Sequence, residues 1–374
     1  MKIVYFTHSL ASCWNHGNAH FLRGVLRELI ILGHEVRVFE PEGAWSLRNL
    51  LADHGEAGLA PYRTAYPELT SLTFTADADA AALCDGADLV IVHEWNDPAL
   101  VAAVGRARAQ GGRYLLLFHD THHRAVSDPK AISAFDLSGY DGVLAFGETL
   151  AAVYRRWGWE DRVFVWHEAA DVRLFHPLPR EERGSGAVWI GNWGDGERTK
   201  ELERFLFAPA RAAGLPLDVY GVRYPTEALA RLKRHGIAYK GWLPNVRAPA
   251  TFARHQVTVH VPRRFYVEAL PGIPTIRVFE ALACGIPLVS APWSDCEGLF
   301  RPGTDFLVAH DGAHMTAHLR AVDADADLRA ALVRNGLETI RTRHTCAHRA
   351  GELLTIAAAL AGTPTPSSML EPVP

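Results

Sequence analysis

Short apolar runs alternating with longer amphipathic stretches constrain the fold of this chain more strongly than any other sequence feature. The first apolar run covers residues 2–7, a helical pattern follows over residues 18–32, and a second apolar run covers residues 35–39. Runs that are apolar on both faces are typical of parallel strands with helices on each side of the sheet. The pattern therefore predicts an α/β fold.

The alternation occurs twice along the chain. Further strands are expected at 72–74, 89–92, 114–118 and 142–146, with helices such as 98–110 and 148–157 between them. The pattern starts again at 187–190 and continues with strands at 217–220, 238–240, 258–261 and 287–290. Two Rossmann-like, doubly wound domains are predicted to face each other across a cleft, because open α/β sheets bind ligands at the carboxyl ends of their strands.

The expected domains are residues 1–172 and 180–345. The polar segment 180–186 reads as the end of a linker. A helix is expected at 346–361, and it can cross back to the first domain. The Pro- and Ser-rich tail at 362–374 is expected to be disordered.

Composition bears on several classes of function. A length of 374 residues suits two domains, and a net charge of -4 gives no basic field for nucleic acid. No apolar run approaches the roughly 20 residues of a transmembrane helix, and the N-terminus does not read as a signal peptide. The five cysteines are scattered and form no CxxC pair. Reduced thiols in a cytoplasmic protein are the expectation.

The segment 270–292, LPGIPTIRVFEALACGIPLVSAP, is the richest in chemical signals. Thr275 can cap a helix that ends near Gly285, and a helix N-terminus offers free N–H groups to a diphosphate. Arg277 adds a positive charge, and Glu280 can accept hydrogen bonds from ribose hydroxyls. An ordinary loop–helix–strand connection with an exposed glutamate is the alternative.

Polar residues also follow the predicted strands of the first domain. Gly17 and Asn18 precede the first helix, where a flexible turn can approach a diphosphate or a sugar; a plain polar loop is the alternative. Glu94, His119 and Asp120 are the candidate catalytic residues, since a histidine beside a carboxylate can act as a general base or hold a hydroxyl in place.

A basic pair opens the second domain. Arg198 and Lys200 follow the strand at 187–190 and can neutralise a diphosphate leaving group. A solvated helix start is the other interpretation.

The motif G-x-P-x-x-R-x-F-E-A-L-A-C-G-x-P-L-V-S resembles the donor-binding segment of GT-B glycosyltransferases of the family 4 kind. THSLASCWNHGNAHFLRG, VWIGNWGDGERTKEL, YGVRYP and YKGWLPN are also similar, and the spore-maturation-type subgroup is closest. The resemblance extends to about residue 360. It implies transfer of a sugar, with retention, from a UDP- or GDP-linked nucleoside diphosphate sugar to a hydroxyl acceptor. It also implies that residues 1–172 form the acceptor-side domain and residues 180–345 the donor domain.

The resemblance also implies roles for individual residues. It places His119 against the donor sugar and a basic pair at Arg198 and Lys200. In the wider family the donor segment has two glutamates eight positions apart; here Glu280 matches the second, and Gly272 stands where the first usually contacts the sugar. The implied donor contacts are Gly17, Asn18, Arg198, Lys200, Arg223, Tyr224, Trp242, Leu243, Gly272, Ile273, Pro274, Thr275, Ile276, Arg277 and Glu280.

No cofactor and no metal are expected. There is no G-x-G-x-x-G or G-x-x-x-x-G-K-[ST] motif. The histidines of HDTHH (119–123) would need a helix to share a metal, and the acidic stretches at 77–79 and 323–327 read as helix caps. Two alternatives to transfer stay open: a nucleotide-sugar 2-epimerase, and a non-catalytic sugar-nucleotide-binding protein. The sequence does not indicate an oligomeric state.

Overall fold

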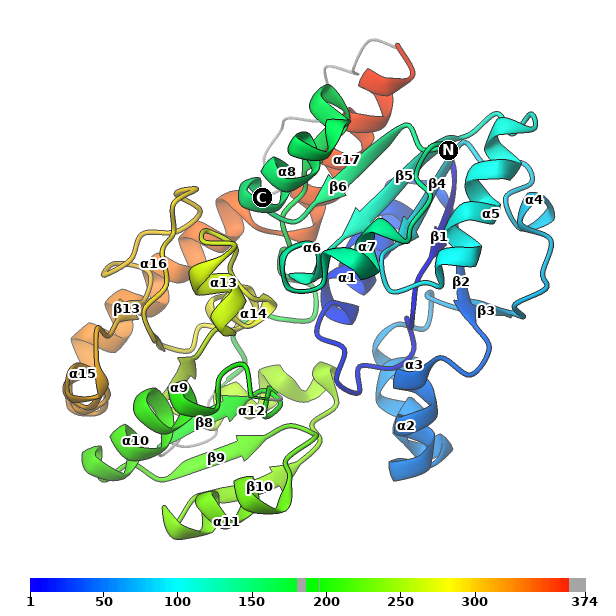
Figure 1. Cartoon of the computed structure of the whole chain (residues 1–374). Coiled ribbons are helices and arrows are strands. Elements are labelled where there is room, and N and C mark those ends of the chain that lie inside the picture. Colours follow the sequence, from blue (N-terminus) through cyan, green and yellow to red (C-terminus); the bar gives the residue numbers. More distant parts are fainter. Residues whose placement is uncertain (180–185, 195, 363–374) are drawn as a thin grey trace. The chain divides into compact units, whose positions relative to one another are not determined.

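The computed structural model describes residues 1–179, 186–194 and 196–362, and the chain forms two compact units (Figure 1). Unit 1 comprises Met1–Glu168 and the segment that begins at Cys346; unit 2 comprises Ala169–Thr345. Unit 1 is therefore built from two separate stretches of sequence. Apart from Gly186 and Gly362, the linker and tail predicted at 180–186 and 362–374 lie outside the described residues.

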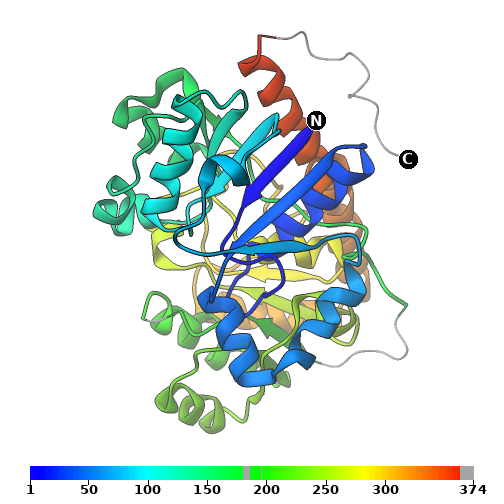
Figure 2. The same cartoon turned by 90° about the vertical axis from the view of Figure 1, so that its right-hand side faces the viewer.

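Unit 1 contains a parallel sheet in the order β3-β2-β1-β4-β5-β6-β7. Its strands are β1 (Lys2–Phe6), β2 (Glu35–Pro41), β3 (Ser71–Phe74), β4 (Leu89–His93), β5 (Leu115–Asp120), β6 (Gly142–Ala145) and β7 (Val163–Val165). The first three strands, in blue shades in Figure 2, run side by side. Strand order reverses between β1 and β4, so the carboxyl ends of these strands are the expected ligand edge.

Helices connect the strands of unit 1. They are α1 (Ala19–Ile31), α2 (Trp45–His54), α3 (Ala60–Ala65), α4 (Ala80–Leu83), α5 (Pro98–Ala109), α6 (Arg124–Ser127), α7 (Pro129–Ser133), α8 (Glu148–Tyr154) and α17 (Cys346–Leu360), with the short turns η1 (Glu56–Leu59), η2 (Arg155–Trp159) and η3 (Glu160–Arg162). α17 packs against α1, and the Trp166 Nε1–H group donates to the Arg349 carbonyl oxygen at 2.9 Å. The last helix of the described chain is thereby part of unit 1.

Unit 2 contains a second parallel sheet, in the order β10-β9-β8-β11-β12-β13. Its strands are β8 (Ala187–Ile190), β9 (Leu217–Tyr220), β10 (Ala238–Gly241), β11 (Val257–His260), β12 (Leu288–Ser290) and β13 (Leu307–Val308). Its helices and turns are α9 (Thr199–Leu202), η4 (Glu203–Phe207), α10 (Ala208–Ala213), α11 (Thr226–Arg234), η5 (Asn245–Arg247), α12 (Ala248–Ala253), α13 (Arg264–Glu268), α14 (Ile276–Ala283), α15 (Gly312–Ala324) and α16 (Ala326–Arg343).

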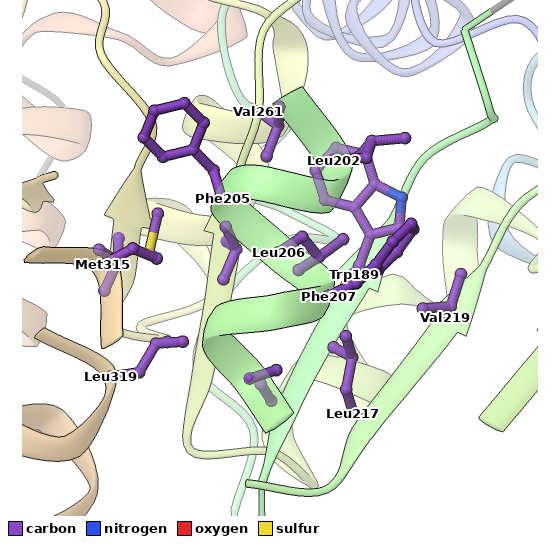
Figure 3. Packing of buried hydrophobic residues seen from close by; sticks show 14 of the residues in the cluster. Trp189, Leu202, Phe205, Leu206, Phe207, Leu217, Val219, Val261, Met315 and Leu319 are labelled. Carbon is purple, nitrogen blue, oxygen red and sulfur yellow. The ribbon is translucent and has the colours of Figure 1, made fainter. Parts of the chain in front are cut away.

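The core of unit 2 forms where α9, η4 and α10 lie beside α15 on the sheet (Figure 3). Its labelled members are Trp189, Leu202, Phe205, Leu206, Phe207, Leu217, Val219, Val261, Met315 and Leu319. Burial of one such large apolar side chain stabilises the fold by about 1.5–3 kcal/mol relative to leaving it exposed. This packing holds the loops after β8 and β9, where candidate site residues lie.

The predicted α/β class and its two parallel sheets are confirmed. Three details differ from the sequence-based expectation. β5 extends to Asp120, so His119 and Asp120 are strand residues rather than loop residues. β7 and β13 were not predicted, because strands of three and two residues carry almost no periodicity. Across the described ranges, no helix combines the length and the apolar character needed to span a bilayer.

Candidate active site

In unit 2, a buried histidine holds the residue before the predicted donor helix. α14 begins at Ile276 after Thr275, whose Oγ1 lies 3.1 Å from His260 Nε2. Ser290 donates its hydroxyl hydrogen to the Ala291 carbonyl oxygen, so it accepts from His260 Nδ1, 2.9 Å away. His260 Nε2 is then the acceptor, and Thr275 donates to it. Burial lowers the pKa of His260 to about 3, which keeps this neutral tautomer in place.

Glu280 is fully buried inside α14, not exposed. Its Oε1 accepts from Asn245 Nδ2 at 2.6 Å, and its Oε2 forms an ion pair with Arg277. Burial raises the pKa of Glu280, while Arg277 and Asn245 oppose that shift. Each carboxylate oxygen can accept two hydrogen bonds, so a ribose hydroxyl can share an oxygen with these partners.

Arg198 is a buried cation held mainly by neutral oxygens. It donates to the carbonyl oxygens of Val261 and Asn192 at 3.2 and 2.8 Å, and to the Asn192 side chain at 2.7 Å. Burial lowers its pKa to about 9, and the charges of Arg263 and Arg277 add to this effect. The three arginines share one region near the start of α14, where Glu197 pairs with Arg263 and Glu280 pairs with Arg277.

The other predicted donor residues of unit 2 lie on neighbouring loops. Arg223 has a positive φ of 62° and lines a cavity of about 450 Å³ together with Trp193, Tyr224 and Arg231. Tyr224 is mostly buried and donates to the Gly191 carbonyl oxygen at 2.9 Å.

Two predicted contacts follow β10, and one predicted cation is exposed. Trp242 and Leu243 are half-buried directly after β10, and Lys200 is exposed in α9 rather than in the preceding loop. In the donor segment itself, Gly272, Ile273, Pro274 and Ile276 are buried, and Thr275 is half-buried. These buried residues therefore shape the loop, while its backbone amides and Arg277 are the polar groups that a ligand can contact.

In unit 1, the predicted catalytic residues meet at the carboxyl ends of β4 and β5. His93 and His119 are paired in register on these strands, with ring centroids 5.4 Å apart. His119 Nδ1 lies 2.5 Å from the Tyr5 hydroxyl. Its Nε2 is buried without a hydrogen-bond partner among the described residues. Burial lowers the pKa of His119 to about 3, so a neutral imidazole faces any ligand there.

The two candidate carboxylates already have partners. Glu94 forms an ion pair with Arg124, and Asp120 accepts from the Tyr154 hydroxyl at 2.7 Å and from the His122 amide at 3.0 Å. Burial raises the pKa of both carboxyls, and the charge of Arg124 opposes the shift in each. Both groups are held in place by donors, so each can position a neighbouring group as well as take up a proton.

The loop between β1 and α1 brings further histidines to this edge. His8, His16 and His93 lie in a row, with ring centroids 5.7 and 6.4 Å apart along it. Glu40 fixes the loop by accepting from the amides of Leu10 and Ala11 at 2.8 and 3.1 Å.

Gly17 and Asn18, the donor contacts implied in unit 1, lie at the end of this loop. Gly17 is exposed, and Asn18 donates to Glu168 Oε1 at 3.1 Å. Asn18 thereby ties the start of α1 to the end of unit 1's first stretch of sequence.

No group of three or more metal-ligating side chains occurs within the described part of the chain. The histidines of residues 119–123 lie on the end of β5 and the following loop, not on a helix. Asp79 caps α4 and Asp325 caps α16, which confirms the prediction of helix caps at both acidic stretches.

Sequence reasoning missed His260, Asn245, Arg263 and Arg124. His260 had a usable signal, since it is a polar residue at the end of an apolar strand next to the donor segment. Asn245, Arg263 and Arg124 lie in loops or at helix starts, where polar residues are common and carry no positional signal.

Two family models match the chain. The model described as Glycosyltransferase Family 4 matches residues 17–174, and the model described as Glycosyl transferase-like matches residues 198–355. They do not overlap, and together they span most of the chain. Comparison with curated protein sequences gives no match.

Solved structures share the fold over nearly the whole chain. Anabaena Alr3699/HepE, solved with UDP and glucose, is 15% identical with a TM-score of 0.65, covering 96% of this chain and 100% of that chain. An α-glucosyltransferase solved with UDP and DNA is 13% identical with a TM-score of 0.70, covering 96% and 99%. T4 phage BGT, solved with UDP and Mn²⁺, is 12% identical with a TM-score of 0.60, covering 96% and 99%.

At these sequence identities the structural likeness establishes the fold alone. The two family matches identify the chain as a glycosyltransferase. The spore-maturation-type subgroup stays a prediction. The chain belongs to the GT-B-fold glycosyltransferases of the family 4 type.

Proposed function

We propose that this protein transfers a hexose from a nucleoside diphosphate sugar to a hydroxyl acceptor, without a metal ion and with retention at the anomeric carbon. The observation that carries the proposal is the cationic region at the start of α14. There the charges of Arg263 and Arg277, which pair with Glu197 and Glu280, also act on the buried Arg198. His260 fixes Thr275, the residue at the N-cap position of α14. Such an arrangement suits a diphosphate.

Charge on the leaving diphosphate grows as the bond between the sugar and the diphosphate breaks. Amide groups at the start of α14 and the guanidinium of Arg198 would stabilise that charge before it forms, which lowers the barrier. The fixed geometry of Thr275 means that little reorganisation is needed. This chemistry requires no metal ion, because cations of the chain take that role.

Retention is supported by the state of the unit 1 carboxylates. An inverting transfer needs a general base for the acceptor hydroxyl. Burial raises the pKa of Glu94 and of Asp120, but each already has a donor, Arg124 or the Tyr154 hydroxyl, in the position that an acceptor hydroxyl would need. His119 has a pKa of about 3 and would be a weak base, so its proposed role is to bind a sugar hydroxyl.

UDP is the first nucleotide to test, because the similar structures of Anabaena HepE, the α-glucosyltransferase and T4 phage BGT contain it. GDP-linked donors remain in the test because the contacts of the described residues do not identify the base. The net charge of -4 gives no support for DNA as the acceptor, although the α-glucosyltransferase was solved with it.

The direct test is a thermal-shift series with UDP, GDP and dTDP, free and sugar-linked. A ligand at one hundred times its dissociation constant stabilises a protein by about 2.7 kcal/mol, which raises the melting temperature measurably. If none of these nucleotides shifts the melting temperature, the donor site is wrong.

Lys200→Ala tests the predicted contact with the diphosphate. Lys233→Ala is the matched control, because Lys200 and Lys233 are both exposed helical lysines of unit 2. Lys200→Ala should weaken nucleoside diphosphate binding roughly three- to tenfold by loss of one cation, and Lys233→Ala should leave it unchanged. Equal effects of the two substitutions would argue against a diphosphate contact at Lys200.

Three further measurements separate the finer parts of the proposal. Turnover that survives EDTA supports metal independence, and the anomeric configuration of the product by NMR decides retention. Conversion of the donor to an epimer without acceptor would replace transfer by 2-epimerisation. Binding without turnover of any donor would favour a non-catalytic role.

A further inference from the structure

A fixed turn follows β12 and covers residues 293–300 (the 293–300 turn). Asp295 accepts from the amides of Leu299 and Phe300 at 3.0 and 2.7 Å, and Gly298 has a φ of 63°. Arg343, at the end of α16, donates to the Gly298 carbonyl oxygen at 3.0 Å. The turn is thus anchored both internally and from α16.

The 293–300 turn lies against the donor segment at Gly272. Cys296 Sγ lies 3.4 Å from the Pro271 carbonyl oxygen. A Cβ atom placed on Gly272 would be 2.5 Å from Cys296 Sγ and 3.3 Å from Glu297 Oε1. The space that a side chain at position 272 would enter is therefore occupied by the thiol and the carboxylate of the turn.

The same turn also reaches the other end of the donor loop. Trp293 packs edge-on against His260, with ring centroids 6.5 Å apart. Thr275 occupies the N-cap position of α14, but its hydroxyl donates to His260 and makes no capping hydrogen bond to the helix, unlike the predicted cap. The position of Glu297 relative to the start of α14 is thus set by packing at two points.

We propose that the carboxylate of Glu297, which the 293–300 turn places beside Gly272, binds hydroxyl groups of the donor sugar. The inference rests on the proposed function and adds a residue that determines which sugar is accepted. A carboxylate repels a phosphate, so the neutral polyhydroxyl part of the donor is what it can hold. Hydrogen bonds from hydroxyl groups to a carboxylate are also stronger than those between neutral groups.

This assignment gives a reason for Gly272. Similar enzymes are expected to place a glutamate at that position, whereas here the carboxylate comes from 25 residues further along the chain. The glycine leaves room for it. Glu297 is a specificity residue in this account and takes no part in breaking the sugar–phosphate bond.

The test compares two dissociation constants in Glu297→Gln, using calorimetry with the nucleoside diphosphate and sugar nucleotide that the wild-type protein binds. The sugar nucleotide should bind roughly tenfold more weakly, as for loss of a charge-assisted hydrogen bond. The free nucleoside diphosphate should bind within about twofold of wild type, since its binding does not involve the sugar. Asp323→Asn, an exposed carboxylate on α15, is the control that should change neither.

Cysteine alkylation checks the geometry independently of binding. Burial, and then the neighbouring Glu297 carboxylate, raise the pKa of the exposed Cys296 thiol. Glu297→Gln should therefore speed the reaction of Cys296 with iodoacetamide at pH 8, by roughly two- to fivefold, because the thiolate is the reactive form. Peptide mass spectrometry follows Cys296 separately from the other cysteines.

Each contrary result has a distinct meaning. If Glu297→Gln binds the sugar nucleotide as tightly as wild type, or weakens both ligands equally, the sugar-binding role is wrong while the donor site stands. An unchanged alkylation rate would show that the carboxylate does not lie beside Cys296 and would also overturn the inference. If wild type binds none of UDP-, GDP- or dTDP-sugars, the proposed function fails, and this inference fails with it.

Discussion

Glu280 shows how one buried side chain can serve both stability and binding. Sequence reasoning predicted a ligand-binding glutamate from its place in the donor motif. The structure adds what the motif does not contain, namely that Asn245 and Arg277 already hold both oxygens. A ribose that binds here joins an existing network, so substitution of Glu280 affects folding as well as affinity.

Glu280→Ala should destabilise unit 2 by about 3 kcal/mol, because it leaves the charge of Arg277 without its buried partner. Urea unfolding followed by tryptophan fluorescence measures this loss. Glu56→Ala, which removes one partner of the exposed ion pair with Arg63, should change stability by less than about 0.5 kcal/mol. Similar losses for the two variants would contradict the assignment of Glu280 to a buried network.

Gly272→Ala should destabilise the protein by roughly 1–3 kcal/mol, because its φ of 92° is unfavourable for alanine and the added Cβ meets Cys296 Sγ. Gly351→Ala is the matched substitution. It lies inside α17, where the Cβ meets no atom within 4 Å, and should stabilise by about 0.5–1 kcal/mol. Melting temperatures that move in the same direction would contradict this.

At the scale of elements, the periodicity of the sequence predicted the long helices and missed the shortest strands. α1 and α14 lie within one or two residues of the helices expected at 18–32 and 275–284, because a capping position or a glycine marks an end of each. β7 was missed, yet it ends just before Trp166, whose ring packs 4.8 Å from His119. The environment of His119 depends on long-range packing that no local pattern encodes.

Leu353→Ala should cost roughly 2–5 kcal/mol, because Leu353 is fully buried on α17 and its removal leaves a cavity. The loss is expected in unit 1, although Leu353 follows all of unit 2 in sequence. Differential scanning calorimetry would show it as a lower transition temperature. Thr355→Ala, at an exposed position of the same helix, should change stability by less than about 0.5 kcal/mol.

At the scale of the whole molecule, buried histidines dominate the response to acid. Burial lowers the pKa to about 3 for His16, His119 and His260 and to about 4 for His8, from 6.5. The folded state therefore binds fewer protons than the unfolded state below pH 6.5, and stability falls as pH falls. The raised pKa values of four carboxyls, those of Glu94, Asp120, Glu280 and Asp295, act in the opposite direction and offset part of this loss.

The expected outcome is a melting temperature that drops between pH 6.5 and pH 5, with each such histidine contributing about 2 kcal/mol of lost stability at pH 5. Calorimetry across this range measures the slope. His16→Asn removes one titrating group. The number of protons taken up on unfolding, which sets the slope of stability against pH, should fall by about one. A melting temperature that is constant from pH 7 to pH 5 would contradict the buried, neutral state of these rings.

The split of unit 1 into two stretches of sequence has a consequence for synthesis. Ribosomes release a chain from its N-terminus, and domains ordinarily fold in that order. Here the segment that completes unit 1 emerges only after every residue of unit 2. The β1–β7 sheet must wait for α17 to cover α1, while unit 2 has its whole sequence available earlier, so the second unit can finish folding before the first.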